Sequence, residues 1–377
     1  MTKRARSLLR IPQGTEAFYL EEAYRHRKLT LHIEEIMYRW GYLPVQTPVF
    51  DFFEVYEPLF SGTDERNIYR LIDREGDLLM LRSDITLFLA RQMGMVLTEE
   101  DLPVRACYFD TILRHQHAED ISKNEFFQAG AELIGRPGLR GDLEIVLLMH
   151  EVLTSLPLPE CRYHVGSHAL FEACFGHLEP AEKGRIRHLI TVRDRSELAE
   201  ELHMRGTGEQ GARFLCELFM LIGEGSDLAQ IARSGASRRL LAGPAENAIR
   251  HLQSVFDVLT ELGVENFFRV DLSEVGRQPY YTGIVFQAFM DGMDDSVASG
   301  GRYDSLLSTF GFSAPSVGFS MMLRKLETAL TDGSRYNVQE KPISATGVTS
   351  EDDSMESVAQ AHRKAQEIRR RGGSATL

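Results

Sequence analysis

The sequence predicts an α+β fold, in which an antiparallel sheet is flanked by helices and interrupted by a long helical insertion. Strand signals at 104–113 and 125–134 flank one polar loop, and the scarcity of crossover helices between strand signals favours antiparallel pairing. From 168 to 262 the apolar spacing is helical almost throughout, and strand runs are missing. These patterns divide the chain into a core (1–167 and 263–330), a helical insertion (168–262), a linker (331–342) and a truncated C-terminal segment (343–377).

The remaining elements follow from apolar spacing and from turn residues. Before the two long strands we expect a helix over 15–41 ended by Gly41, an edge strand confined by Pro44 and Pro48, a hairpin over 67–81 and a helix over 85–95. After them we expect a helix over 142–156, strands over 267–272 and 280–290, a closing helix near 317–330, a strand over 343–348 and a last amphipathic helix. A single strand and helix cannot bury their own apolar face, so this tail must dock elsewhere or be loosely ordered.

Composition excludes several classes of protein. The 377 residues are 43% apolar and 26% charged, and the net charge of −13 argues against a broad nucleic-acid footprint. No apolar run is long enough to span a membrane, and the basic N-terminus lacks the apolar stretch of a signal peptide. Cys107, Cys161, Cys174 and Cys216 have no metal-ligand spacing. We therefore expect a cytoplasmic protein with reduced cysteines and no bound metal or cofactor.

The strand over 125–134 carries the first sign of a binding site. Successive side chains of a strand point to opposite faces, so Gln128, Gly130 and Glu132 share one face while Ala129 and Ala131 lie on the other. The second face is ordinary core. The first places an amide and a carboxylate on either side of a glycine, which leaves room for a ligand against the backbone. Such a face can hold a small zwitterion or a cationic ring.

Other segments give weaker signals, each with a plain structural alternative. Asp84 and Thr86 lie where a strand turns into a helix, and helix capping alone explains an aspartate there. Arg114 is either an exposed loop arginine or a fork that clamps a carboxylate. Tyr280 and Tyr281 fit a binding strand, although tyrosine pairs in strands usually serve sheet packing.

The segment GGRYD, from Gly300 to Asp304, is harder to explain by structure alone. Two glycines in a strand are costly unless something approaches the backbone closely. Each of these signals is weak, but their order and spacing together are specific.

Taken in order, the motifs from about Thr15 to Leu330 resemble the catalytic core of class II aminoacyl-tRNA synthetases, specifically the histidyl-tRNA synthetase branch. The long helix with TPVFDFFEVYEPLFSG is similar to the first motif, a dimerisation element, and the run from Arg114 to Glu132 is similar to the second. LRSDIT, YYTGIVF and GGRYD resemble histidine-recognition segments of that branch. The resemblance implies that Asp84, Thr86 and Gln128 hold an α-amino group, that Arg114 faces the carboxylate and that Glu132 and Tyr281 contact an imidazole. The implied histidine-binding set is Asp84, Thr86, Arg114, Gln128, Glu132, Tyr280 and Tyr281.

Several departures indicate that the nucleotide half of such a site is eroded. The loop after Arg114 reads HAEDISKNE, with Glu119, Asp120 and Glu125 against Lys123 alone. In the third motif Met322, Arg324 and Lys325 replace the expected glycine, glutamate and arginine, and lysine lacks the planar guanidinium fork. Gly276 stands where an arginine is expected, with Arg277 one position on, and a one-residue shift on a strand turns a side chain to the other face. The anticodon-binding domain is reduced to one strand and one helix, so tRNA is not an expected partner.

A kept histidine pocket beside an eroded nucleotide site resembles the regulatory subunits of ATP phosphoribosyltransferase, a non-catalytic branch of the same family. That resemblance implies a dimer formed through the first motif. It also implies assembly with a short-form catalytic subunit, usually as a hetero-octamer in histidine biosynthesis, with histidine as the feedback ligand. Two alternatives remain, a divergent histidyl-tRNA synthetase and a class II-like amino-acid ligase. Both need an intact ATP site, against which the same departures count.

Overall fold

The computed structural model describes residues 14–15, 17–60, 65–115, 124–233, 241–330, 345–348 and 354–376. Its centre is a nine-stranded sheet in the order β1-β5-β6-β12-β11-β10-β7-β9-β8. The strands, in that order, are Leu43–Pro44, Val104–Leu113, Glu125–Ile134, Ser316–Met322, Ala298–Arg302, Ile284–Met290, Cys161–Ser167, Phe268–Asp271 and Ile222–Gly223. All neighbours from β5 to β7 are antiparallel, and β1 and β9 add parallel pairs. The predicted α+β class with an antiparallel sheet is confirmed.

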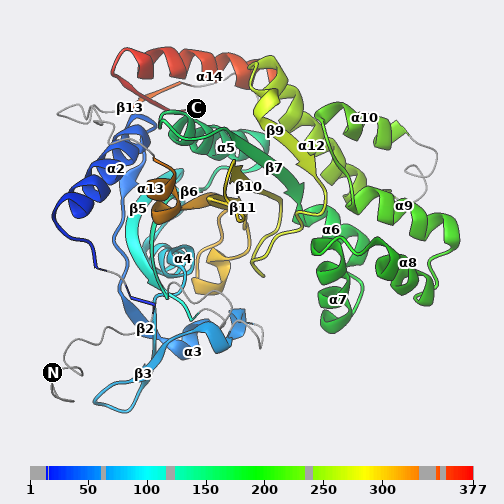
Figure 1. Ribbon diagram of the computed structural model, residues 1–377, viewed down its shortest axis with the longest axis horizontal. Helices are drawn as coiled ribbons and strands as arrows, with labels where there is room; N and C mark the ends of the chain where they lie inside the picture. Colours follow the sequence, from blue (N-terminus) through cyan, green and yellow to red (C-terminus); the bar gives the residue numbers. More distant parts are fainter. Residues whose placement is uncertain are drawn as a thin grey trace.

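A second sheet of three strands lies apart from the large one, at the lower end of the molecule in Figure 1. It has the order β2-β4-β3, with β2 at Phe50–Phe52, β3 at Arg70–Ile72 and β4 at Leu78–Leu81. The predicted hairpin over 67–81 is confirmed as β3 and β4. The Asp73 side chain accepts backbone N–H groups of Glu75, Gly76 and Asp77 and so closes the turn. Helix α3 (Phe53–Tyr56) and 3₁₀ turns at Glu57–Leu59 and Glu65–Asn67 complete this end.

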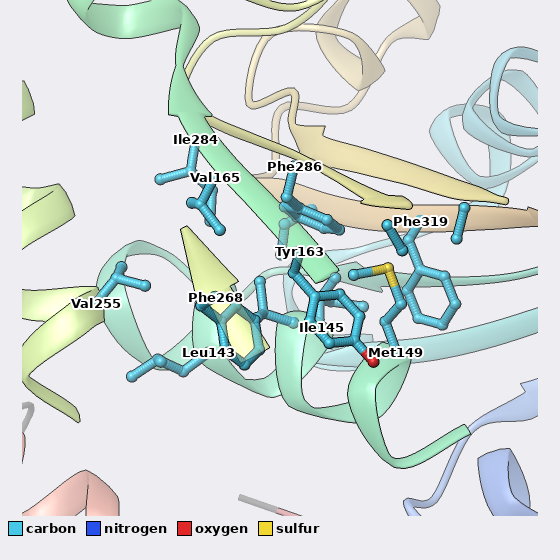
Figure 2. Packing of buried hydrophobic residues seen from close by; sticks show 14 of the residues in the cluster. Leu143, Ile145, Met149, Tyr163, Val165, Val255, Phe268, Ile284, Phe286 and Phe319 are labelled. Carbon is cyan, nitrogen blue, oxygen red and sulfur yellow. The ribbon is translucent and has the colours of Figure 1, made fainter. Parts of the chain in front are cut away.

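Helices cover the large sheet and form its main core. They are α2 (Leu20–Arg39), α4 (Ile85–Val96), α5 (Gly138–Thr154), α12 (Pro244–Glu261) and α13 (Leu323–Ala329), with 3₁₀ turns at Glu99–Asp101, Glu265–Phe267 and Leu307–Phe310. Figure 2 shows side chains of α5 and α12 packed against strand residues such as Tyr163, Phe268 and Phe286. All of these rings are at most 1% exposed. This buried layer gives the strands above it a rigid base on which to hold a site.

Residues 168–233 form a group of short helices to one side of the sheet (Figure 1). They are α6 (His168–Phe175), α7 (Pro180–Thr191), α8 (Arg195–Met204), α9 (Glu209–Phe219) and α10 (Gly225–Arg233). The two-residue strand β8 also lies in this stretch and pairs with β9, although the sequence predicts no strand here. Arg193, in the turn after α7, forms an ion pair with Asp271 of β9. This ion pair joins the helices to the sheet.

The C-terminal segment docks on the core. Strand β13 (Ala345–Gly347), helix α14 (Met355–Arg370) and strand β14 (Ser374–Thr376) form a βαβ unit whose two strands pair in parallel. Helix α14 packs on α12 and runs beside α5 (Figure 1). Arg369 lies over the Trp40 ring at the end of α2, with its guanidinium carbon 3.6 Å from the ring centroid. Of the two outcomes predicted for the tail, docking on the core is the one that the structure shows. Strand β14 was not predicted.

Four predicted boundaries are wrong. The first helix begins at Leu20, since Tyr19 is extended (φ −121°, ψ 139°). The strand predicted over 280–290 begins at Ile284 because a turn precedes it, and the helix predicted over 142–156 spans Gly138–Thr154. The closing helix near 317–330 is in fact β12 followed by α13. SVGFSMM is a short apolar run that fits a buried strand as well as a helix, and its position between β6 and β11 decides for the strand.

Two smaller findings complete the description. The four cysteines are free, as the sequence predicts for reduced side chains. Within the described residues no helix combines the length and the apolar character needed to cross a bilayer. The linker 331–342 lies outside the described residues.

Candidate functional site

A pocket of about 90 Å³ lies over the middle of the large sheet. All seven residues predicted for the site line it: Asp84, Thr86, Arg114, Gln128, Glu132, Tyr280 and Tyr281. They come from α4, the end of β5, β6 and the loop before β10. Segments more than 150 residues apart in the chain therefore meet at one small cavity, which agrees with the interpretation of these motifs as parts of one site.

Glu132 forms the floor of this pocket and is 1% exposed. Its Oε1 accepts hydrogen bonds from the Thr86 hydroxyl at 2.6 Å and, more weakly, from the Tyr108 hydroxyl at 3.4 Å, while its Oε2 accepts a short one from Tyr303. Burial raises the pKa of Glu132 to about 8, against the opposing effect of these hydrogen bonds. The carboxyl group is therefore fixed in place and holds a proton more tightly than an ordinary glutamate.

Gly318 explains how β12 passes so close to that carboxyl group. A Cβ atom at Gly318 would lie 1.6 Å from Oε2 of Glu132, directly across the β6–β12 pair. Only glycine leaves this space. Gly130, which the sequence singles out on the same face, is equally confined, since its Cβ would meet the Tyr108 ring at 2.3 Å.

Asp84 both caps a helix and faces the pocket. Its Oδ1 accepts the backbone N–H of Leu87 at 3.1 Å, which caps α4, and its Oδ2 accepts the hydroxyl of Tyr280 at 3.0 Å. The capping alternative is therefore correct but incomplete. Burial, followed by the charge of Asp84, raises the pKa of Tyr280 well above its ordinary value, so the hydroxyl stays a donor.

Arg114 stands at the mouth of the pocket. It donates to the backbone oxygen of Ser83 at 2.8 Å, so one arm of its fork is already used. Gln128, which is 6% exposed, points its amide toward the sulfur of Met322 at 3.7 Å. The side chain of Met322 thus occupies space next to Gln128 that the glycine of the family pattern would leave open.

Tyr280 and Tyr281 lie in a loop before β10, so the prediction that both lie on a strand is wrong. Gly276 turns this loop with φ +85°, and a Cβ there would come within 2.9 Å of the Tyr281 ring. The same ring also packs on Gly301, where an added Cβ atom would lie only 2.8 Å from it. Because Arg277 is in the loop, the shift by one position does not turn it away, and it lines the larger pocket described next.

A second pocket of about 630 Å³ adjoins the first and shares Arg114, Tyr281 and Met322 with it. Two of its basic side chains, Lys325 and Arg324, are committed within the protein. Lys325 binds Asp295 at 2.7 Å and the backbone oxygen of Ser296 at 2.8 Å. Arg324 binds Glu22 at 2.8 Å. Of the acidic loop that the sequence places after Arg114, Glu125 lines this pocket, whereas Glu119, Asp120 and Lys123 lie outside the described residues.

Three pocket residues were missed by the sequence reasoning. Tyr108 and Tyr303 donate to Glu132, and Gln278 lines both pockets. Tyr303 belongs to the GGRYD segment and was available as a signal. The neighbouring Arg302 positions it by binding Asp142 of α5 at 2.8 Å. Among the described residues no group of three or more histidine, cysteine or acidic side chains is placed to hold a metal ion.

The large antiparallel sheet, with this pocket on it, defines a class II aminoacyl-tRNA synthetase-like protein. The histidyl-tRNA synthetase family model matches residues 14–326. A solved structure from Bacillus halodurans, described as an ATP phosphoribosyltransferase regulatory subunit/histidyl-tRNA synthetase, superposes with a TM-score of 0.76. It is 24% identical and covers 98% of this chain and 92% of its own length. The predicted class II synthetase-like fold is thus confirmed.

Relatives narrow the family further. An ATP phosphoribosyltransferase regulatory subunit from a Thermoanaerobacter species is 30% identical over 325 residues, which are 86% of this chain and 83% of the relative. One from Moorella thermoacetica is 32% identical over 323 residues, or 84% of this chain and 81% of the relative. The chain belongs to the family of ATP phosphoribosyltransferase regulatory subunits, within the histidyl-tRNA synthetase-like proteins.

Proposed function

We propose that this chain is a non-catalytic regulatory subunit that assembles with the short-form catalytic subunit of ATP phosphoribosyltransferase, supports its catalysis and conveys feedback inhibition by histidine. The observation that carries the proposal is the contrast between the two pockets. The small one is lined by all seven residues predicted to bind an amino acid, whereas Lys325 and Arg324 beside the large one are held in internal ion pairs. Side chains so occupied are poorly placed to neutralise phosphates, which adenylate formation requires.

Histidine fits the small pocket by its chemistry. We expect the carboxyl group of Glu132 to face a ring N–H of the ligand. Tyr281 lines the same pocket, and Arg114 and Asp84 offer opposite charges to the two ends of a zwitterion. For feedback, histidine must bind one state of the assembly better than another, and the coupling is then reciprocal. We place this assembly in the cytoplasm, in line with four unpaired cysteines.

Co-expression with a short-form catalytic subunit tests the proposal. We expect the two chains to co-purify as a hetero-octamer, and we expect the transfer of the phosphoribosyl group to ATP to be faster in the complex than with the catalytic subunit alone. Histidine should then lower the rate of the complex by roughly 5–150-fold, the usual range of allosteric coupling. Failure to co-purify would count against the proposal. Histidine-dependent pyrophosphate–ATP exchange by this chain would favour the synthetase or ligase alternative instead.

We also propose that the chain dimerises through the small sheet and the β1 edge. Large apolar side chains are exposed there in an unusual number for a surface: Leu43, Val49, Phe50, Phe52, Leu71, Ile72 and Leu78. β1 is the terminal strand of the nine-stranded sheet, so among the described residues one of its edges has no partner strand and can accept one from a second copy.

Charged substitutions on this surface should produce a monomer. We expect a Phe50→Glu/Ile72→Glu double variant to elute as a folded monomer, because both side chains are more than half exposed and their replacement leaves the core intact. Size-exclusion chromatography with light scattering measures the mass. Met204→Glu, at a position that is 75% exposed on α8, is the matched control and should remain dimeric. A double variant that keeps the mass of a dimer would place the interface elsewhere.

A further inference from the structure

Glu132 is surrounded by donors that carry no charge. Thr86, Tyr108 and Tyr303 each direct a hydroxyl at its carboxyl group, and these come from α4, β5 and the end of β11. Within the described part of the chain, no lysine, arginine or histidine forms an ion pair with Glu132. A buried carboxylate without a cation is costly, so the empty pocket favours the neutral acid.

The other charged groups of the pocket do not change this balance. Asp84, on the same wall, adds a second negative charge and so disfavours ionisation of Glu132. Arg114 lines the mouth and donates to Ser83. Tyr280 and Tyr281 face the pocket from the loop and remain neutral, because burial and the charge of Asp84 raise their pKa. With Glu132 ionised, the carboxylates of Asp84 and Glu132 would face the single guanidinium of Arg114, and the pocket would lack one positive charge.

We propose that Glu132 enters the binding step as the neutral acid and passes its proton to the histidine ring, so that the bound ligand is an imidazolium facing a carboxylate. This inference rests on the proposed histidine site. In the transfer the O–H bond of Glu132 breaks and an N–H bond forms on the previously unprotonated ring nitrogen. One neutral pair becomes one ion pair, and no proton is exchanged with water. The product supplies the missing positive charge of the pocket.

The physical driving force is the arrival of an opposite charge at a buried carboxyl group. Before binding, burial holds the pKa of Glu132 at about 8, above the ordinary value of free histidine's ring. After transfer, the imidazolium stabilises the carboxylate and the carboxylate stabilises the imidazolium. The Thr86, Tyr108 and Tyr303 hydroxyls already lie at the carboxyl oxygens. While Glu132 is protonated one of them accepts its O–H, and after the transfer that hydroxyl needs only to rotate its own O–H to stabilise the anion.

Proton counting by calorimetry tests the proposal. Histidine is titrated into the full-length chain in pairs of buffers with different heats of ionisation, at three pH values. Near pH 7.2, midway between about 6.5 for the ring and about 8 for Glu132, we expect no net exchange with the buffer. Near pH 9 we expect uptake of roughly one proton beyond that taken up by the α-amino group of the ligand, which titrates in this range and binds in its charged form, and near pH 5.5 release of roughly one. The affinity should be flat between about pH 6.5 and 8 and fall on both sides.

Two rival arrangements give different counts. A permanently ionised Glu132 that takes up imidazolium requires uptake of nearly one proton near pH 7.2, in roughly the proportion set by a ring pKa of about 6.5. An ionised Glu132 that accepts from a neutral ring gives, near pH 9, only the uptake by the α-amino group of the ligand. A neutral acid that donates without transfer gives the expected counts, so ring-labelled ¹⁵N-histidine is needed as a second measurement. Bound histidine at pH 8 should show the nitrogen shifts of imidazolium, and shifts of a neutral ring would overturn the transfer.

Variants supply the remaining arm. Glu132→Gln cannot give up a proton, so we expect its affinity for histidine to fall by roughly 100-fold or more. Its proton uptake near pH 9 should drop to that of the α-amino group of the ligand alone. Glu125→Gln, on the same strand but outside the small pocket, is the matched control and should bind like the wild type. Absence of histidine binding by the wild type at every pH would overturn both the site and this inference. Binding without the predicted change from proton release near pH 5.5 to proton uptake near pH 9 would overturn this inference alone.

Discussion

The free energy of unfolding of the wild type, minus that of Glu132→Gln, should fall by on the order of 4 kcal/mol between pH 4.5 and pH 8.5. The pKa of Glu132 is raised from 4.5 to about 8 in the folded chain. Its stabilising contribution is therefore complete below pH 4.5, declines as the pH rises and is lost above about pH 8. Urea denaturation at half-unit intervals of pH measures both curves.

Subtraction of the variant removes the groups that titrate in the opposite sense. Burial lowers the pKa of His150 to about 4 and of His362 to about 3, so their contributions are lost as the pH falls below about 6.5. Both histidines are present in wild type and variant alike. The constant cost of the glutamine amide shifts the difference without changing its slope.

A surface carboxylate provides the control for this prediction. Glu160→Gln changes a half-exposed side chain far from the pocket, and its curve should follow that of the wild type. If the wild-type and Glu132→Gln curves ran parallel across the whole range, Glu132 would be ionised in the folded chain. The proton transfer inferred above would then lose its donor.

The strand that carries Glu132 shows what the sequence can predict well. The bounds of β5 and β6 were predicted correctly. Along β6 the faces follow directly from strand geometry, because successive side chains point to opposite sides. The same alternation placed Gln128 and Glu132 together in the pocket. Residues that motif order assigned to one site, such as Asp84 and Tyr281, line the same pocket, although their contacts within the protein were not predicted.

The elements and contacts that the sequence did not predict share a physical cause, because residues far apart in the chain determine them. The short apolar run of β12 fits a helix as well as a strand, and only its pairing with β11 and β6 shows that it is a strand. Tyr108 and Tyr303 come to Glu132 through strand pairing that no local pattern encodes. Thr86 was expected at an α-amino group, yet in the structure its hydroxyl donates to Glu132. Long-range pairing therefore sets the roles, while local spacing sets the elements.

Arg369 ties the C-terminal unit to the core at its far end, and Arg369→Ala should loosen this docking. Arg369 is 2% exposed, its guanidinium covers the Trp40 ring, and it donates to the backbone oxygen of Ala375 at 2.9 Å. Its Nε lies 3.7 Å from Glu151, which also accepts from the Trp40 indole at 3.1 Å. Three helices and β14 thus meet at this side chain. Its loss removes a buried cation–π contact and leaves Glu151 without its cation, at a cost of about 3 kcal/mol.

Hydrogen exchange followed by mass spectrometry measures this loosening. In Arg369→Ala the amides of α14 should exchange roughly 100-fold faster, as expected for a local opening made about 3 kcal/mol easier, while those of β6 keep their wild-type protection. Arg371→Ala is the matched control, since Arg371 lies at the same end of the unit but is exposed and pairs only with Glu367 among the described residues. We expect it to exchange like the wild type.

Because Arg369 and the pocket lie on different parts of the fold, histidine binding should persist in Arg369→Ala. Wild-type protection of α14 in that variant would instead assign the docking to the apolar face of the helix, through Val358, Ala361 and Ala365.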